Sequence, residues 1–126
     1  MAKVLIVDDN SEHVSLVRRV LAAYGYEVMA AKDGETGLQT AIEQRPNIIM
    51  LDLGLPDVDG QTLLGYMRQA PELTGVPIIA VTAWPVGTAP QMVEAYGFDG
   101  YISKPLKFST LGEQIAAYLQ PERVRP

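Results

Sequence analysis

The chain has 126 residues, of which 15 are acidic and 10 are basic, so its formal net charge is −5. This length accommodates one compact domain and excludes a two-domain enzyme. The absence of cysteine excludes disulfides, a thiolate nucleophile and cysteine-based zinc sites, and the single histidine, His13, excludes a histidine cluster for a transition metal.

The distribution of charge and apolar residues also limits the partners. Phosphate neutralisation requires clustered Lys and Arg, and Arg18-Arg19 is the only adjacent basic pair. No apolar run approaches the roughly 18 residues that a membrane span requires, and the first residues carry no cleavage-site pattern. We therefore expect a cytoplasmic protein that binds neither nucleic acid nor a membrane.

Short apolar runs alternate with amphipathic stretches along the whole chain, which is typical of βα units around a parallel sheet buried on both faces. The predicted strands are Val4–Val7, Glu27–Ala30, Ile48–Leu51, Pro77–Val81 and Tyr101–Ser103. We expect a single doubly wound α/β domain over residues 1–120, with five strands in the order 2-1-3-4-5 and five helices. Residues 121–126 are expected to be a flexible C-terminal tail, or the start of a linker.

Between the strands, apolar residues recur at helical spacing and predict stripes that face the core. These stripes are Val14, Val17 and Leu21; Leu38, Ala41 and Ile42; Leu63, Leu64 and Met67; and Phe108, Leu111, Ile115, Tyr118 and Leu119.

Capping residues predict where the helices begin and end. Asp33 and Asp59 precede the second and third helices, and Gly25 and Gly97 follow the first and fourth. Thr88-Ala89-Pro90-Gln91 resembles a capping box with proline in the first turn, so the fourth helix should begin late.

Polar residues follow four of the predicted strands: Asp8 and Asp9 the first, Asp52 the third, Thr82 the fourth and Lys104 the fifth. Each alone has an ordinary structural interpretation, as a helix cap, a strand-end hydrogen bond or a solvated charge. Together, at the edge where parallel strands end, they predict three converging carboxylates that bind Mg²⁺ rather than zinc. Such a crevice has the cation, the donors and the carboxylate nucleophile that phosphoryl transfer to an aspartate requires.

The segments that carry these residues resemble the response regulator receiver domains of two-component signalling, with a flavodoxin-like fold. The likeness extends from Lys3 to about Leu119. It is carried by the acidic signature Val4–Asn10, the phosphoacceptor loop Leu51–Gly60, the switch-threonine segment Val81–Ala83 and the lysine loop Tyr101–Pro105.

The resemblance implies a role for each matching residue. Asp52 would be the phosphoacceptor, Asp9 and Asp52 direct Mg²⁺ ligands, Asp8 a ligand through water, and the Gly54 carbonyl the last protein ligand. Thr82 and Lys104 would bind phosphoryl oxygens and act with Asp52 in catalysis of the transfer. Tyr101 would be the switch aromatic beside Thr82, and the Lys104-Pro105 peptide bond is expected to be cis.

The resemblance also implies the partners. The phosphoryl donor would be a sensor histidine kinase or a histidine phosphotransfer protein, and a downstream protein would bind the face made by the fourth helix, fifth strand and fifth helix. We expect a regulator without a DNA-binding output, and no enzyme activity beyond its own Mg²⁺-dependent phosphorylation and dephosphorylation. Apolar residues on the fifth helix allow a homodimer, but core packing explains the same spacing.

Three positions depart from the family pattern. Gly54, two residues after Asp52, is smaller than usual, and Trp84, two residues after Thr82, is bulkier, so we predict that these two residues set the phosphoryl lifetime. Pro85 to Pro90 alters the start of the fourth helix, which makes partner choice the least transferable property.

Other interpretations fit less well. A haloacid-dehalogenase-like phosphatase requires an acid where Asn10 stands, a flavodoxin phosphate loop would be repelled by Asp8 and Asp9, and no P-loop motif is present. A phosphotransfer domain built on His13 would be all helical, so His13 is interpreted as a solvated helix residue. The remaining alternatives are a receiver fold that acts as an interaction or dimerisation module without phosphorylation, and a receiver excised from a hybrid kinase.

Overall fold

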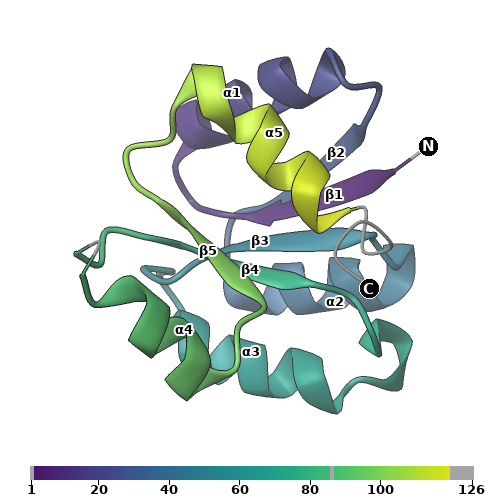
Figure 1. The fold of residues 1–126 in the computed structure, drawn as a ribbon. Coiled ribbons are helices and arrows are strands. Elements are labelled where there is room, and N and C mark those ends of the chain that lie inside the picture. The colour runs from purple at the N-terminus through teal and green to yellow at the C-terminus, as the bar shows by residue number, and fades with distance from the viewer. Residues whose placement is uncertain (1, 86, 120–126) are drawn as a thin grey trace, which may run out of the picture.

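A computed structural model describes residues 2–85 and 87–119, and these form a five-stranded parallel sheet in the order β2-β1-β3-β4-β5 (Figure 1). The strands are β1 (Lys3–Val7), β2 (Glu27–Ala31), β3 (Ile48–Asp52), β4 (Ile78–Thr82) and β5 (Gly100–Ser103). The helices are α1 (Ser11–Ala22), α2 (Gly34–Gln44), α3 (Gly60–Gln69), α4 (Ala89–Tyr96) and α5 (Phe108–Tyr118), with a short 3-10 helix, η1 (Pro71–Leu73), after α3. The predicted strand order and fold class are confirmed, and every strand boundary lies within one residue of its prediction. The predicted tail over residues 121–126 lies outside the described residues.

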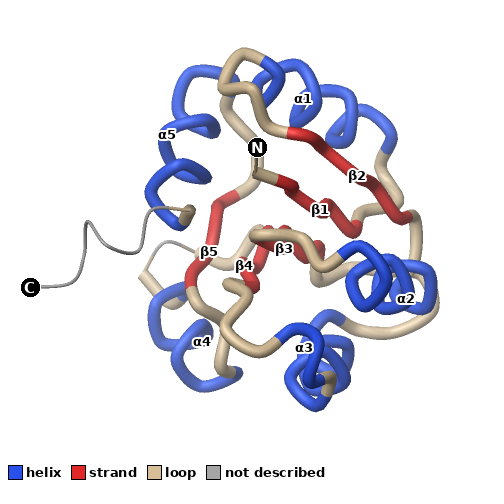
Figure 2. The backbone as a smooth tube through the Cα atoms, turned by 90° about the vertical axis from the view of Figure 1, so that its right-hand side faces the viewer, coloured by secondary structure: helices blue, strands red, loops and turns tan. Residues whose placement is uncertain are grey.

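The sheet is covered by helices on both faces, with α1 and α5 on one side and α2, α3 and α4 on the other (Figures 1 and 2). Alternate residues of β1 point to opposite faces: Val4 and Ile6 belong to the core beneath α1 and α5, and Leu5 and Val7 to the core beneath the other three helices. This two-sided burial explains why the strands are continuous apolar runs rather than alternating ones.

The predicted caps explain where several helices begin and end. Asp33 and Asp59 each accept a hydrogen bond of 2.8 Å from the backbone N–H three residues later, at the starts of α2 and α3. Gly25 and Gly97 have φ angles of 76° and 89°, in the left-handed region that glycine adopts without a Cβ penalty, where the chain leaves α1 and α4.

The capping box predicted for α4 is wrong, although the late start of the helix is confirmed. Thr88 has backbone angles near the helical region, φ −112° and ψ −19°, and its side chain does not cap the helix. Its hydroxyl instead donates to the carbonyl oxygen of Pro85 at 3.1 Å. The Thr88 hydroxyl therefore bonds to the preceding loop and does not cap α4.

Phe108 is the one predicted stripe residue of α5 that the structure places outside the core, with 60% of its surface exposed. It is the first residue of α5, and the guanidinium carbon of Arg19, on α1, lies 5.7 Å from its ring centroid. A cation over an aromatic face is favourable at an exposed site, so Phe108 packs against α1 instead of the sheet.

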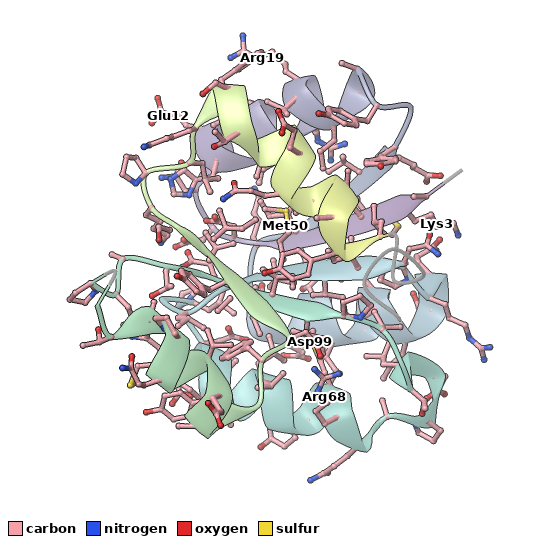
Figure 3. All side chains as sticks on the ribbon, viewed as in Figure 1. Lys3, Glu12, Arg19, Met50, Arg68 and Asp99 are labelled. Atoms are coloured by element: carbon pink, nitrogen blue, oxygen red, sulfur yellow. The ribbon has the colours of Figure 1, made fainter. Side chains whose placement is uncertain are left out.

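At the amino ends of the strands, Arg68 of α3 forms an ion pair with Asp99 (Figure 3). Nη2 of Arg68 lies 2.6 Å from Oδ2 of Asp99, and the same carboxylate oxygen accepts the backbone N–H of Ile78 at 2.8 Å. These contacts fix α3 and the start of β4 relative to each other. Within the described residues, no helix is long and apolar enough to cross a membrane.

Candidate functional site

Three carboxylates meet at the carboxyl ends of β1 and β3, as predicted. Asp8 and Asp9 follow β1 and Asp52 ends β3, and β1 pairs directly with β3. One carboxylate oxygen of each residue lies within 4.8 Å of the others. Asp8 and Asp52 are buried whereas Asp9 is exposed. Three anionic oxygens this close repel one another unless a cation is shared between them.

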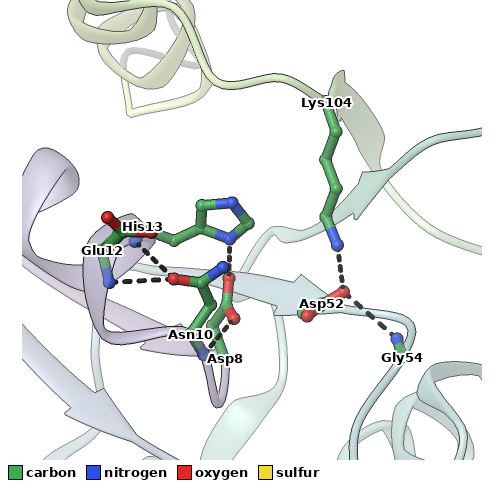
Figure 4. A network of polar contacts seen from close by, with 7 residues as sticks. All are labelled: Asp8, Asn10, Glu12, His13, Asp52, Gly54 and Lys104. Atoms are coloured by element: carbon green, nitrogen blue, oxygen red, sulfur yellow. Dashed lines mark hydrogen bonds and ion pairs between the residues drawn. The ribbon is translucent and has the colours of Figure 1, made fainter.

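Asp8 is held by the first turn of α1 (Figure 4). Its Oδ1 accepts the backbone N–H of Asn10 at 2.9 Å, and its Oδ2 lies 2.9 Å from Nδ1 of His13. Burial raises the pKa of Asp8 and the charge of Asp52 raises it further, while the contacts with Asn10 and His13 act in the opposite direction. Burial is the dominant cause, so the ionised form of Asp8 is disfavoured at this position.

His13 is a site neighbour that the sequence interpretation missed. The sequence favours a solvated helix residue at this position, but only 24% of the His13 side chain is exposed and it contacts Asp8. Asn10 caps α1 by accepting the backbone N–H groups of Glu12 and His13, which places His13 in the first turn beside the end of β1. The signal in the sequence was the short distance along the chain between the acidic pair and the histidine.

Asp52 is paired with Lys104 across the sheet (Figure 4). Nζ of Lys104 lies 2.9 Å from Oδ1 of Asp52, and the same oxygen accepts the backbone N–H of Gly54 at 3.1 Å. Both contacts are made to Oδ1, and neither of them involves Oδ2. Lys104 follows β5, and its peptide bond to Pro105 is cis, as predicted.

A cavity of about 400 Å³ adjoins Asp52 and is lined by Gly54, Thr82, Trp84 and Lys104 among others. Thr82 is buried at the end of β4, and its Oγ1 accepts the backbone N–H of Trp84 at 3.0 Å. The structure therefore brings the predicted acceptor, hydroxyl and ammonium together around one cavity.

Gly54 and Trp84, which differ widely in size, both line this cavity. A Cβ placed on Gly54 would have only Oδ1 of Asp52 near it, at 3.9 Å, so this side is open. The half-buried indole of Trp84 also lines the cavity.

Tyr101, the predicted switch aromatic, is half-buried on β5 and packs against the core beneath α2, α3 and α4. It also lines a second cavity, of about 690 Å³, together with Lys104, Lys107 and Tyr118. Burial raises the pKa of the Tyr118 phenol above its ordinary value. Tyr101 therefore lies at the edge of the sheet that β5 forms, and it shares a cavity with the lysine that contacts Asp52.

Comparison with known proteins decides the family. The sequence model of the response regulator receiver domain matches residues 4–116. The chain belongs to the response regulator receiver family. Among its relatives, the polar-differentiation response regulator DivK of Brucella anthropi is 35% identical over 116 residues, covering 92% of this chain and 94% of that protein. The DivK protein of Brucella ovis is 34% identical over the same length.

Solved structures of receivers match the fold closely. The chemotaxis response regulator CheY4 of Vibrio cholerae superposes with a TM-score of 0.87 at 31% identity, covering 94% of this chain and 99% of that one. The receiver domain of a Pseudomonas aeruginosa sensor histidine kinase has a TM-score of 0.82 at 28% identity, covering 94% of this chain and 97% of that one. That structure holds a magnesium ion in its active-site cleft. The receiver fold predicted from the sequence is thus confirmed by both comparisons.

Proposed function

We propose that this receiver domain accepts a phosphoryl group on Asp52 from a phosphohistidine of a sensor histidine kinase or phosphotransfer protein, and that phosphorylation switches a protein-binding surface. The observation that carries the proposal is the contact of 2.9 Å between Lys104 and Asp52 beside the two further carboxylates. A carboxylate with a paired ammonium and a neighbouring hydroxyl is equipped for phosphoryl transfer rather than for packing.

The transfer requires only positioning and charge stabilisation from the protein. Oδ2 of Asp52 attacks the phosphorus atom, and the new O–P bond forms as the P–N bond of the phosphohistidine breaks. The imidazole leaves with the electron pair of that bond and takes up a proton. Lys104 would bind one phosphoryl oxygen as an ammonium donor, and the Thr82 hydroxyl would donate to another.

The carboxylate cluster fits a magnesium ion by its chemistry. Hard divalent cations prefer oxygen ligands, and the three carboxylates offer oxygens within 4.8 Å of one another. In the proposed site Asp9 and Asp52 would bind the ion directly, Asp8 would bind it through water, and the carbonyl of Gly54 would complete the protein ligands. When bound, Mg²⁺ neutralises charge on the carboxylates and on the incoming phosphoryl oxygens. The magnesium in the related kinase receiver supports this assignment.

The proposed switch begins at Thr82. When its hydroxyl turns toward a phosphoryl oxygen, it gives up the bond that it accepts from the Trp84 N–H, and the loop after β4 is released. Tyr101 then turns inward beside it, and the surface of α4, β5 and α5 changes its affinity for a downstream protein. The protein is proposed to act in the cytoplasm, through protein contacts, and to catalyse no reaction beyond its own phosphorylation and dephosphorylation.

Intact-mass spectrometry tests the proposal directly. The protein is incubated with Mg²⁺ and a small-molecule phosphodonor beside an Asp52→Asn control. Addition of one phosphoryl group to the parent alone supports the proposal. No addition, repeated with a histidine kinase as donor, would indicate an interaction or dimerisation module that works without phosphorylation.

A further inference from the structure

Trp84 stands between the cavity at Asp52 and helix α4. It is the only tryptophan in the sequence, and it lines the cavity together with Gly54, Thr82 and Lys104. Its backbone N–H is fixed by the bond to Oγ1 of Thr82 at 3.0 Å. That bond fixes the backbone of Trp84, whereas the position of its indole depends on the side chains that it packs against.

The indole packs against the core beneath α2, α3 and α4, and its ring also stacks on Tyr96. The two ring centroids lie 6.0 Å apart and the ring planes are 20° from parallel. Near-parallel rings at this separation attract each other beyond the burial of their surface. Tyr96 is the last residue of α4, and Gly97, with φ 89°, ends the helix directly after it. The stack therefore connects a loop side chain at the cavity to the last turn of a helix.

Tyr96 is not a core residue, since 42% of its surface is exposed. It belongs to a small set of large hydrophobic residues that are exposed among the described residues: Tyr24, Tyr66, Tyr96 and Phe108. An exposed tyrosine whose ring lies against the wall of a functional cavity is suited to position that wall rather than to stabilise the fold.

From this arrangement we propose that Tyr96 is a positioning residue for the phosphorylated site: it holds Trp84 over the cavity and so limits the access of water to Asp52. The inference rests on the proposed phosphorylation of Asp52. In the hydrolysis that it slows, a water oxygen attacks phosphorus, the bond between phosphorus and the Asp52 oxygen breaks, inorganic phosphate leaves and the carboxylate is restored. The last turn of α4 thereby sets how long the signal lasts.

Fluorescence tests the positioning without phosphorylation. Because Trp84 is the only tryptophan, acrylamide quenching of indole emission reports on this residue alone. We expect Tyr96→Ala to increase quenching, Tyr96→Phe to leave it unchanged because the ring remains, and the control Tyr66→Ala, an exposed tyrosine on α3, to leave it unchanged. Equal quenching in the parent and in Tyr96→Ala would overturn the inference.

The decay of the phosphorylated protein tests the consequence. We expect Tyr96→Ala and Trp84→Ala each to shorten the phosphoryl lifetime by about two- to tenfold, the range that corresponds to the loss of one aromatic pair. The double variant should decay no faster than Trp84→Ala, because Tyr96 acts only through the indole. Additive effects, or a parent-like lifetime in Tyr96→Ala, would overturn the inference. A parent that takes up no phosphoryl group would overturn the proposed function, while the quenching result would still report on the stack.

Discussion

Nζ of Lys104 and Oδ1 of Asp52 lie 2.9 Å apart although the two residues are separated by 52 positions in the sequence. Their strands, β5 and β3, are not neighbours, because β4 lies between them. The lysine therefore reaches across the end of β4 to contact the carboxylate. It compensates one of the three negative charges that β1 and β3 bring together, and it does so at the oxygen that the Gly54 N–H also contacts.

Removal of this ammonium is expected to slow phosphorylation. In Lys104→Met the phosphoryl oxygen loses a charged donor in a partly buried site, and the loss of one such preorganised donor costs about 10²- to 10³-fold in rate. A time course of phosphorylation by a small-molecule donor, followed by intact mass, measures the effect. Lys107→Met, an exposed lysine of the same loop, is the matched control and should react at the parent rate. Equal rates in Lys104→Met and the control would contradict the role given to Lys104.

Asp8→Asn is expected to change stability and metal binding in opposite directions. The folded-state pKa of Asp8 is raised by burial, so the ionised carboxylate destabilises the fold at neutral pH. This destabilisation is lost as pH falls through the raised pKa, because the carboxyl is then protonated. The neutral amide removes that penalty while it can still accept the Asn10 N–H. In excess EDTA at pH 7 the urea midpoint of Asp8→Asn should therefore exceed that of the parent.

The same variant should bind Mg²⁺ about 10- to 100-fold more weakly, the usual cost of altering a group that acts through a bound water. The rise of the urea midpoint with Mg²⁺ concentration gives the affinity of the folded state. Glu113→Gln, which removes an exposed carboxylate on α5, is the control and should retain parent affinity. A parent-like Mg²⁺ dependence in Asp8→Asn would exclude Asp8 from the metal site.

A larger side chain at position 54 is expected to prolong phosphorylation. Position 54 is open, since a Cβ there would have only Oδ1 of Asp52 near it, at 3.9 Å. Gly54→Met should cover the open side of the cavity and lengthen the phosphoryl lifetime severalfold, and Gly54→Ala should lengthen it less. The decay is followed by intact mass after the donor is removed. An unchanged lifetime in Gly54→Met, together with an unchanged lifetime in Trp84→Ala, would show that these two residues do not control the access of water to the phosphoryl group.

The fold was predictable from the sequence because its signals are local. Each strand is a continuous apolar run, and Asp33 and Asp59 cap their helices through bonds to residues three positions later. The convergence of Asp52, Thr82 and Lys104 was also predictable, since a parallel sheet brings the ends of its strands to one edge. The strand order then needed only the pairing of β1 with β3.

Contacts between side chains of different helices and loops were not predictable in the same way. The position of Phe108 beneath Arg19 depends on how α1 and α5 pack, and the stack of Trp84 on Tyr96 depends on the path of the loop before α4. His13 was misinterpreted because a single histidine in a helix gives no indication of which neighbour it meets. Such features follow from tertiary packing, which the spacing of apolar residues does not encode.

Asp57 makes a contribution to stability that depends on pH. It lies in the loop between β3 and α3, and its two carboxylate oxygens accept the backbone N–H groups of Gly34 and Glu35 at 2.8 and 3.0 Å, at the start of α2. These bonds lower the pKa of Asp57, the bond from Gly34 most of all. A lowered folded-state pKa stabilises the fold above the ordinary aspartate pKa of about 3.9, and this stabilisation is lost as pH falls through the lowered value.

Asp57→Ala should therefore lower the urea midpoint at pH 7, by a small amount because the carboxylate is exposed and screened by solvent. The difference from the parent should shrink as pH falls below the ordinary aspartate pKa, since the parent then also loses the charge. Asp57→Asn keeps one acceptor oxygen and carries no charge, so its difference from Asp57→Ala should not change with pH. If the parent and Asp57→Ala differ equally at neutral and acid pH, the charge of Asp57 is not what ties the loop after β3 to the start of α2.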